Sequence, residues 1–302
     1  MQYKDWLNEW LETTIKPMAK YRTYEKYGRI VNKHLIPALG EYDLQDLSAL
    51  ILQSYIAELC GKYATNTVTG IVAVINNSLD RAFKIGITDR NYAAGIVYPK
   101  TQDSEVQCFT VQEQKKIESY IIKSDKDKLF GIILCLYTGL RIGELLALKW
   151  SDIDFDKALI TVSNSCRDAW ENGRYVKVFD TPKTANSRRV IPLPKQLIQP
   201  LKAIRKRSHD EMVVSGKTDG QISIRSYQRT FELLLKKIRV EHKGFHVLRH
   251  TFATRAIECG MDVKTLSEIM GHKNPNVTLK RYVRSLLEHK TAMMNRLGKL
   301  FE

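Results

Sequence analysis

One short stretch divides this chain of 302 residues into two parts with different sequence patterns. Residues 99–108 begin with a proline, continue with polar residues, and show neither the helical nor the strand period. A chain of this length can build two domains, each with its own core. We therefore expect a domain over 1–98, a linker over 99–108, a second domain over 109–285 and a last helix over 286–302.

Residues 1–98 show apolar residues at helical spacing and no convincing strand. Prolines should end helices here, because proline lacks the backbone N–H that a helix interior needs. We expect an opening helix interrupted by Pro17, a second over about 23–35 that ends before Pro37, a third over 46–59 and a fourth over about 65–83. Together they predict a helical bundle.

The second part mixes helices with a few strands. Thr110 followed by Glu113 forms a capping box, which marks a helix start directly after the linker. An apolar helix over 129–137 and another from Arg141 onward are expected next. Strands are predicted at 158–163, 174–179 and 189–193, with a turn at 172–173 between the first two. The fold class is therefore mainly α, with one small antiparallel β-sheet in the C-terminal domain.

The charge of the chain indicates a polyanionic partner. The formal net charge is +15, and residues 1–98 hold 11 Lys and Arg against 10 Asp and Glu, so nearly all of the excess lies in the second part. Such an excess favours binding to nucleic acid, although solvated lysine faces are the ordinary alternative.

Several functions are disfavoured by what the sequence lacks. The five cysteines are scattered without a CxxC pair, which argues against a zinc ribbon or redox motif and fits a reducing cytoplasm. No signal peptide and no apolar run of 18 residues is present, so we expect a cytoplasmic, nucleoid-associated protein without a membrane partner. Without a GxxxxGK[ST] loop or a carboxylate cluster, we expect no ATP, metal or other cofactor.

Residues 245–282 gather side chains that phosphodiester chemistry needs. A tyrosine such as Tyr282 can attack phosphorus if other groups neutralise the phosphate and protonate the leaving oxygen. Guanidinium groups bind phosphate oxygens with paired hydrogen bonds, and Arg141 and Arg249 are the candidates. Each arginine is expected beside a helix start, where backbone N–H groups add positive potential.

Proton transfer has more than one candidate. Lys183, at the tip of a predicted turn, could protonate the leaving 5′ oxygen, and either His246 or His272 could handle the proton of the tyrosine. Taken singly, each of these residues also has a purely structural explanation, such as a surface charge or a half-buried aromatic ring. For His250, a hydrogen bond within the fold is favoured over a chemical role.

Two groups of residues are candidate DNA contacts. Thr65, Asn66 and Thr67 stand at a predicted helix start and could donate to phosphate, with simple helix capping as the alternative. Arg188 and Arg189 follow the lysine turn and are the other candidates.

The motifs of the second part resemble those of the tyrosine recombinases, also called the phage integrase family. The resemblance covers residues 109–285 and rests on four stretches: TGLRIGEL at 138–145, TPKT at 181–184 with SRRVIPL at 187–193, HVLRHTFAT at 246–254, and MGHK at 270–273 with Arg281-Tyr282. It implies a catalytic set of Arg141, Lys183, His246, Arg249, His272 and Tyr282. Glu144 matches an acidic position that supports the arginines, and residues 1–98 resemble the family's helical core-binding domain.

The resemblance implies a site-specific DNA recombinase or integrase that works through a 3′-phosphotyrosyl intermediate. Four protomers would act on two double-stranded DNA sites, for integration or excision of a mobile element, with a possible excisionase or DNA-bending accessory protein. The last helix, which otherwise folds back on its own domain, would dock on the neighbouring protomer. Two alternatives stay open: a sequence-specific DNA-binding regulator without catalysis, and an enzyme that relaxes DNA like a type IB topoisomerase.

Overall fold

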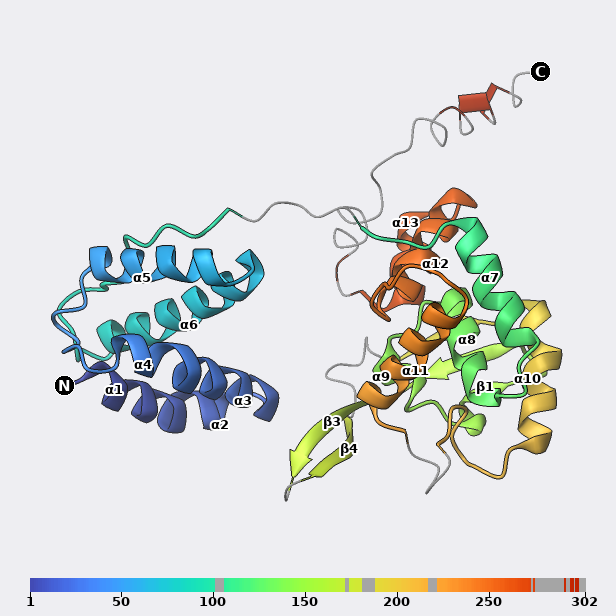
Figure 1. Ribbon diagram of the computed structural model, residues 1–302, viewed down its shortest axis with the longest axis horizontal. Helices are drawn as coiled ribbons and strands as arrows, with labels where there is room; N and C mark the ends of the chain where they lie inside the picture. The colour runs from blue at the N-terminus through green and yellow to red at the C-terminus, as the bar shows by residue number, and fades with distance from the viewer. Residues whose placement is uncertain are drawn as a thin grey trace. The chain divides into compact units, whose positions relative to one another are not determined.

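A computed structural model describes most of the chain, namely residues 1–100, 106–171, 174–180, 188–216, 222–272, 274, 291, 294–295 and 297–298. The chain divides into two compact units, Met1–Ser104 and Glu105–Glu302. Figure 1 shows the first unit as helices alone and the second as helices around small sheets. The division falls within the predicted linker. No helix among the described residues is long and apolar enough to cross a membrane.

The first unit consists of four helical segments, two of which contain a π-helical turn. The first segment is α1 (Tyr3–Trp10), η1 (Leu11–Ile15) and α2 (Lys16–Met18), and the second is α3 (Tyr21–Ile30), η2 (Val31–Leu35) and α4 (Ile36–Leu39). The third and fourth are α5 (Ala49–Lys62) and α6 (Thr65–Lys84). The predicted bundle is confirmed, with every described element of this unit helical.

The prediction that Pro17 and Pro37 end their helices is wrong. Both helices continue for one or two residues past the proline, because a π turn precedes each of them. The backbone N–H of Lys16 bonds to the carbonyl of Leu11, five residues back. This wider turn accommodates a proline ring that would clash with a carbonyl four residues earlier in a regular helix.

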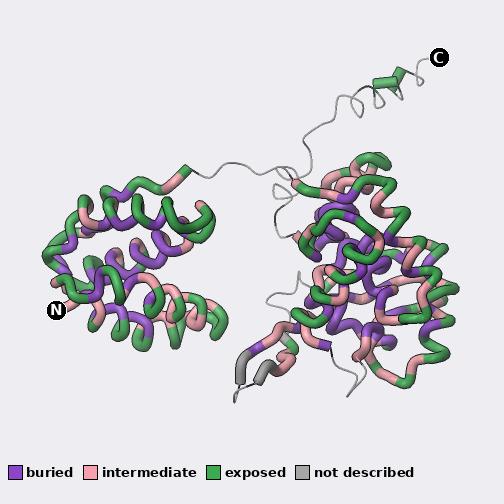
Figure 2. Tube along the Cα trace, viewed as in Figure 1, coloured by how far each residue is buried: buried purple, intermediate pink, exposed green. Residues whose placement is uncertain are grey.

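The core of the first unit takes residues from all four helical segments, and side-chain hydrogen bonds join α1 to α6 within it. Trp6 and Trp10 are each 1% exposed, and the indole of Trp6 donates to the carbonyl of Ser78 at 3.0 Å. The buried hydroxyl of Tyr3 lies 2.8 Å from that of Ser78. These hydrogen bonds satisfy the polar atoms of Tyr3 and Trp6. Figure 2 shows that the buried residues lie along the inner faces of the helices.

The second unit begins with the predicted capping box. Thr110 accepts from the N–H of Glu113, and Glu113 accepts from the N–H of Thr110, at the start of α7. The helices and helical turns that follow are α7 (Val111–Ile122), η3 (Asp127–Leu129), α8 (Phe130–Thr138), α9 (Ile142–Leu145), η4 (Trp150–Asp152), α10 (Lys195–Arg207), α11 (Ile224–Lys237), α12 (Val247–Glu258) and α13 (Val263–Met270). Most of the predicted last helix, 286–302, lies outside the described residues.

The strands form two antiparallel sheets among the described residues, not the single sheet that was predicted. One sheet has the order β1 (Ile153–Asp154), β2 (Leu159–Val162), β5 (Arg189–Pro192), and the other pairs β3 (Ser165–Glu171) with β4 (Arg174–Asp180). Strand β3 was missed, since it mixes charged and apolar residues without clear alternation. The strand at 174–179 was predicted to follow the strand at 158–163 through a turn, but β4 pairs with β3. Strand β2 pairs with β5, with Ile160 opposite Ile191.

The point where the chain enters the second unit is attached to α12. The N–H of Phe109 donates to Thr251 Oγ1 at 2.9 Å, and Arg255 Nη2 donates to the carbonyl of Phe109 at 2.8 Å. The ring of Phe109 is completely buried and packs edge-on against Phe231. The helix α12, which carries the HVLRHTFAT motif, is therefore bonded to the beginning of its own unit.

Candidate active site

Arg141 stands at the junction of two helices. The apolar helix α8 ends at Gly139, which adopts a left-handed conformation with φ of 65°. Its α-carbon packs so closely against the ring of Phe252 that a Cβ would lie 2.5 Å from it, so glycine suits both the turn and the space. Arg141 then precedes the short helix α9, and 39% of its side chain is exposed. The tight turn thus presents Arg141 at the surface of the unit.

Arg249 comes from α12 and is buried. Only 2% of the residue is exposed, and its Nη1 donates to the carbonyl of Gly139 at 2.6 Å. Its Nη2 donates to the carbonyl of Met270 at 2.5 Å and lies 3.0 Å from Nε2 of His272. A single guanidinium therefore joins the end of α8, the end of α13 and one of the candidate histidines.

His272 is placed by the end of α13. Gly271 is left-handed with φ of 63°, its N–H bonds to the carbonyl of Glu268, and the N–H of His272 bonds to that of Ser267. This is the Schellman pattern, which turns the chain sharply after a helix. The hydroxyl of Ser267 also donates to the carbonyl of His272 at 3.4 Å. The sharp turn directs His272 toward Arg249.

Three arginines bond to the carbonyls at the end of α13. Arg189 Nε donates to Ile269 at 2.6 Å, Arg249 Nη2 to Met270 at 2.5 Å, and Arg141 Nη2 to Gly271 at 3.4 Å. The last carbonyls of a helix lack partners within the helix and form its negative end, so positive groups there are stabilising. The end of α13 in this way brings together arginines from the turn before α9, from β5 and from α12 near His272.

Glu144 is the carboxylate of this cluster. It is 8% exposed and accepts from both the N–H and the guanidinium of Arg141, at 2.9 and 2.8 Å. Arg189 binds the same carboxylate with two parallel hydrogen bonds of 3.0 and 2.8 Å. Burial alone would raise the pKa of Glu144, but the hydrogen bonds and charge of Arg189, followed by the charge of Arg141, lower it to about 2. Glu144 is therefore ionised throughout the neutral range.

His246 directly precedes α12, and His250 lies in its first turn. Their rings meet edge to face, with centroids 4.6 Å apart. His246 is exposed and precedes the helix, whereas His250 is 8% exposed. His246, not His250, is thus the accessible histidine of this pair.

Two members of the predicted catalytic set lie outside the described residues, namely Lys183 and Tyr282. The structure does describe another lysine close to the first motif, which sequence reasoning did not consider. Lys177 on β4 donates through Nζ to the carbonyl of Leu146 at 2.7 Å, and burial lowers its pKa. Burial of this lysine was not visible in the sequence, because the strand β3 that pairs with β4 was itself missed.

The candidate DNA contacts have different environments. The prediction that Arg189 contacts DNA is not supported, because 7% of its side chain is exposed and its guanidinium binds Glu144 and Ile269. Its neighbour Arg188 is exposed. In the first unit, Asn66 and Thr67 are exposed in the first turn of α6, and Thr65 is half-buried. The residue that precedes this helix is Ala64, so these side chains are not its caps.

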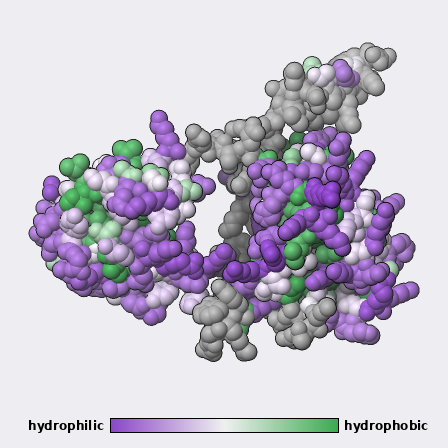
Figure 3. All heavy atoms as spheres, viewed as in Figure 1, coloured by the Kyte–Doolittle hydropathy of each residue, from purple (hydrophilic) through white to green (hydrophobic). Residues whose placement is uncertain are grey.

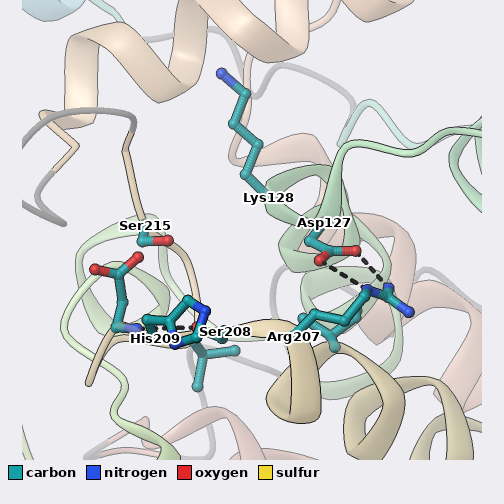
Figure 4. A pocket seen from close by; sticks show the side chains of 9 residues that line it. Asp127, Lys128, Arg207, Ser208, His209 and Ser215 are labelled. Atoms are coloured by element: carbon teal, nitrogen blue, oxygen red, sulfur yellow. Dashed lines mark hydrogen bonds and ion pairs between the residues drawn. The ribbon is translucent and has the colours of Figure 1, made fainter.

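A cavity of about 220 Å³ lies elsewhere in the second unit, between η3 and the end of α10. Figure 4 shows that Arg207 points toward Asp127 in the lining of this cavity, and their closest atoms are 2.7 Å apart. Neither residue belongs to the predicted set, so this cavity is distinct from the candidate site. Within the described ranges, no group of three or more His, Cys, Asp and Glu residues could hold a metal ion.

The arrangement is suited to binding an anion. Figure 3 shows that the visible face of each unit is mainly hydrophilic. Arg141 and Arg249 place two positive charges beside His272, while His246 stands exposed on the helix of Arg249. A phosphodiester in the pentacoordinate transition state carries two negative charges, which two guanidiniums can neutralise without a metal. The described part of the site is therefore suited to binding a phosphodiester.

The chain belongs to the phage integrase family. Residues 107–289 match the model of this family, and residues 2–60 match the N-terminal SAM-like domain of phage integrases. The protein is therefore a tyrosine site-specific recombinase, an enzyme that breaks and rejoins DNA strands.

Curated relatives include recombinases and transposition proteins. A tyrosine recombinase XerC-like protein of Caldanaerobacter subterraneus is 29% identical, over 98% of this chain and 83% of that protein. The transposase from transposon Tn916 of Enterococcus faecalis is 30% identical over 74% of this chain and 62% of its own length. The ICEBs1 integrase of Bacillus subtilis is 26% identical over 87% of this chain and 74% of its own.

Solved structures share the fold over nearly the whole chain. The Tn1549 transposon integrase in complex with a circular intermediate DNA matches 98% of this chain and 99% of its own, with a TM-score of 0.85 and 21% identity. A lambda integrase dimer bound to a COC′ core site matches 92% of this chain and 97% of its own, with a TM-score of 0.72 and 18% identity. The predicted fold class, mainly α with antiparallel β-structure in the C-terminal domain, is confirmed, although the strands form two small sheets and not one.

Proposed function

We propose that this recombinase integrates or excises a mobile element through a 3′-phosphotyrosyl intermediate. The observation that carries the chemistry is the convergence of Arg141, Arg249 and His272 at the end of α13, with His246 on the helix of Arg249. The mobile-element role is supported by similarity to the Tn916 transposase and the ICEBs1 integrase.

In the proposed reaction, Tyr282 Oη attacks the scissile phosphorus and the bond to the 5′ oxygen breaks. The tyrosine proton passes to His246 or His272, and Lys183 protonates the leaving oxygen. Arg141 and Arg249 stabilise the additional negative charge, while Glu144 holds Arg141 in place. The phosphotyrosyl ester retains the energy of the broken bond, so the free 5′ hydroxyl of another strand rejoins the DNA without ATP.

Assembly and DNA contacts are part of the proposal. The structural relatives include a lambda integrase tetramer bound to a Holliday junction. By analogy, four protomers act on two double-stranded sites, with an excisionase or DNA-bending protein as a further partner. Exposed Asn66 and Thr67 at the start of α6, with Thr65, and exposed Arg188 are the proposed phosphate contacts.

A covalent-trapping experiment tests the function. DNA bound covalently to the full chain in cells is recovered and sequenced, and the site is rebuilt as a nicked duplex whose cleaved end diffuses away. The wild-type chain and the control variant Tyr42→Phe should form a covalent adduct, with or without EDTA. Tyr282→Phe should form none.

Three other outcomes would contradict the proposed nucleophile or the proposed function. An adduct with Tyr282→Phe would show that another residue is the nucleophile. Tight sequence-specific binding without any adduct would favour the regulator. Relaxation of supercoiled plasmid without a specific sequence would favour a topoisomerase-like enzyme.

A further inference from the structure

We propose that Arg189 is a positioning residue for DNA cleavage: it neutralises the carboxylate of Glu144 and so leaves the charge of Arg141 available to the scissile phosphate. This inference rests on the proposed function, in which Arg141 binds that phosphate. It gives a role to an arginine that lies outside the six-residue set predicted from the motifs.

The two arginines that share Glu144 differ in their access to solvent. The side chain of Arg189 is 7% exposed, whereas that of Arg141 is 39% exposed. Arg189 occupies the carboxylate with a bidentate pair of hydrogen bonds, at 3.0 and 2.8 Å. Arg141 uses one guanidinium nitrogen, at 2.8 Å. The buried arginine is thus the main counter-ion of Glu144, and the exposed arginine faces the surface.

The charges of the cluster support this division of roles. One carboxylate and two guanidiniums sum to a net charge of +1, whereas Glu144 and Arg141 alone would sum to zero. Burying a carboxylate beside Arg141 would then cancel the field that a phosphate needs, since charges act strongly where water is excluded. The bidentate partner restores the positive charge. Consistently, Arg189 contributes more than Arg141 to lowering the pKa of Glu144.

Arg189 also connects the cluster mechanically to α13. Its Nε donates to the carbonyl of Ile269 at 2.6 Å. Gly271 packs on its guanidinium, where a Cβ would lie 3.0 Å from Nη1. Arg189 therefore contacts both Glu144, which binds Arg141, and the turn at Gly271 that places His272. A purely mechanical role is therefore the rival explanation, and the experiment must separate charge from packing.

Four variants of the full chain separate the two explanations. Arg189→Met removes the charge and keeps an unbranched apolar stem, and Arg189→Lys keeps the charge without the bidentate geometry. Glu144→Gln combined with Arg189→Met removes both charges. The matched control is Arg207→Met. Arg207 also pairs with a carboxylate, that of Asp127, but 60% of its side chain is exposed and neither residue belongs to the predicted catalytic set. Single-turnover cleavage of the trapped DNA site is measured, with DNA binding measured in a Tyr282→Phe background.

The charge role predicts a specific pattern of rates. Arg189→Met should cleave roughly 15- to 100-fold more slowly than wild type, the range that Coulomb's law gives for a unit charge acting over about 6–10 Å at an effective dielectric of about 20. The double variant should cleave at least about tenfold faster than Arg189→Met, because Arg141 then has no carboxylate beside it that cancels its charge. Arg189→Lys should stay within roughly fivefold of wild type, and Arg207→Met should match wild type. DNA binding should weaken by up to a similar factor in Arg189→Met, because the bound phosphate already carries one negative charge, and should change little in the other three variants.

A double variant as slow as Arg189→Met would overturn the proposal, because loss of packing at position 189 is common to both variants.

Two further comparisons make the result decisive. If Arg189→Met does not fold, as judged by its thermal unfolding, the double variant and Arg189→Lys still report on charge, and an Arg189→Lys rate about 15-fold or more below wild type would overturn the proposal. Arg141→Ala distinguishes this proposal from the proposed function. If Arg141→Ala cleaves normally, the proposed phosphate contact fails. If it is inactive while Arg189→Met behaves like Arg207→Met, only the role of Arg189 fails.

Discussion

Nη2 of Arg249 lies 3.0 Å from Nε2 of His272, although the two residues are 23 positions apart in the chain. The same guanidinium bonds to the carbonyls of Gly139 and Met270, so it holds three segments together while it carries the charge proposed for catalysis. Structural and chemical roles are thus combined in one buried side chain.

Arg249→Lys should therefore destabilise the second unit. A single ammonium cannot reach the positions of both Nη atoms, so at least one buried carbonyl loses its partner, at a cost of roughly 2–4 kcal/mol. The free energy of unfolding in urea checks this expectation. Arg229→Lys is the control, because that side chain is 68% exposed and should change stability by less than about 0.5 kcal/mol. Equal stability of the two variants would show that Arg249 does not anchor the helix ends.

Glu144→Gln should remove a pH dependence from stability. The folded-state pKa of Glu144 is about 2, below its value in an unfolded chain of about 4.3. Its ionised form thus stabilises the fold above about pH 4.3, by on the order of 3 kcal/mol, and this stability is lost as pH falls toward 2. The difference in unfolding free energy between wild type and Glu144→Gln should be large at pH 7 and small near pH 2. Other carboxylates titrate in both proteins and cancel, so a constant difference would contradict the assignment.

Gly271→Ala should cost more than backbone strain alone. A left-handed alanine costs about 1–2 kcal/mol, and the new Cβ would also lie 3.0 Å from Arg189 Nη1. Gly86→Ala is the control, because Gly86 has φ of 80° with no atom within 4 Å of the added Cβ. In urea unfolding, the excess loss for Gly271→Ala measures the contact with Arg189. Identical losses would mean that the guanidinium moves aside freely.

Lys183→Ala should slow DNA cleavage roughly 10²- to 10⁴-fold, the usual contribution of a general acid. The defect should largely disappear on a substrate with sulfur in place of the leaving 5′ oxygen, because a thiolate leaves without a proton. Lys177→Ala is the comparison, because burial lowers the pKa of Lys177 and makes it the other candidate proton donor. If the sulfur substrate rescued Lys177→Ala and not Lys183→Ala, Lys177 would be the general acid.

Local sequence signals predicted the elements that local interactions decide. The capping box of Thr110 and Glu113 is present as predicted, since it depends on residues three apart. The helix ends at Pro17 and Pro37 were predicted wrongly, because a π turn can accommodate proline when packing holds the helix together. Strand β3 was missed because its residues do not alternate between apolar and polar; its extended conformation is held by pairing with β4.

The chain by itself determined which chemical groups are present: the spaced motifs, the basic charge and the glycines at 139 and 271, where left-handed turns follow helices. Only the tertiary structure decided which arginines are exposed and which are buried on Glu144 or on the end of α13. Adjacent in sequence, Arg188 is exposed while Arg189 is buried on Glu144, 45 positions away. No local pattern distinguishes the two, because the difference comes from the burial of one carboxylate and one helix end that require cationic partners.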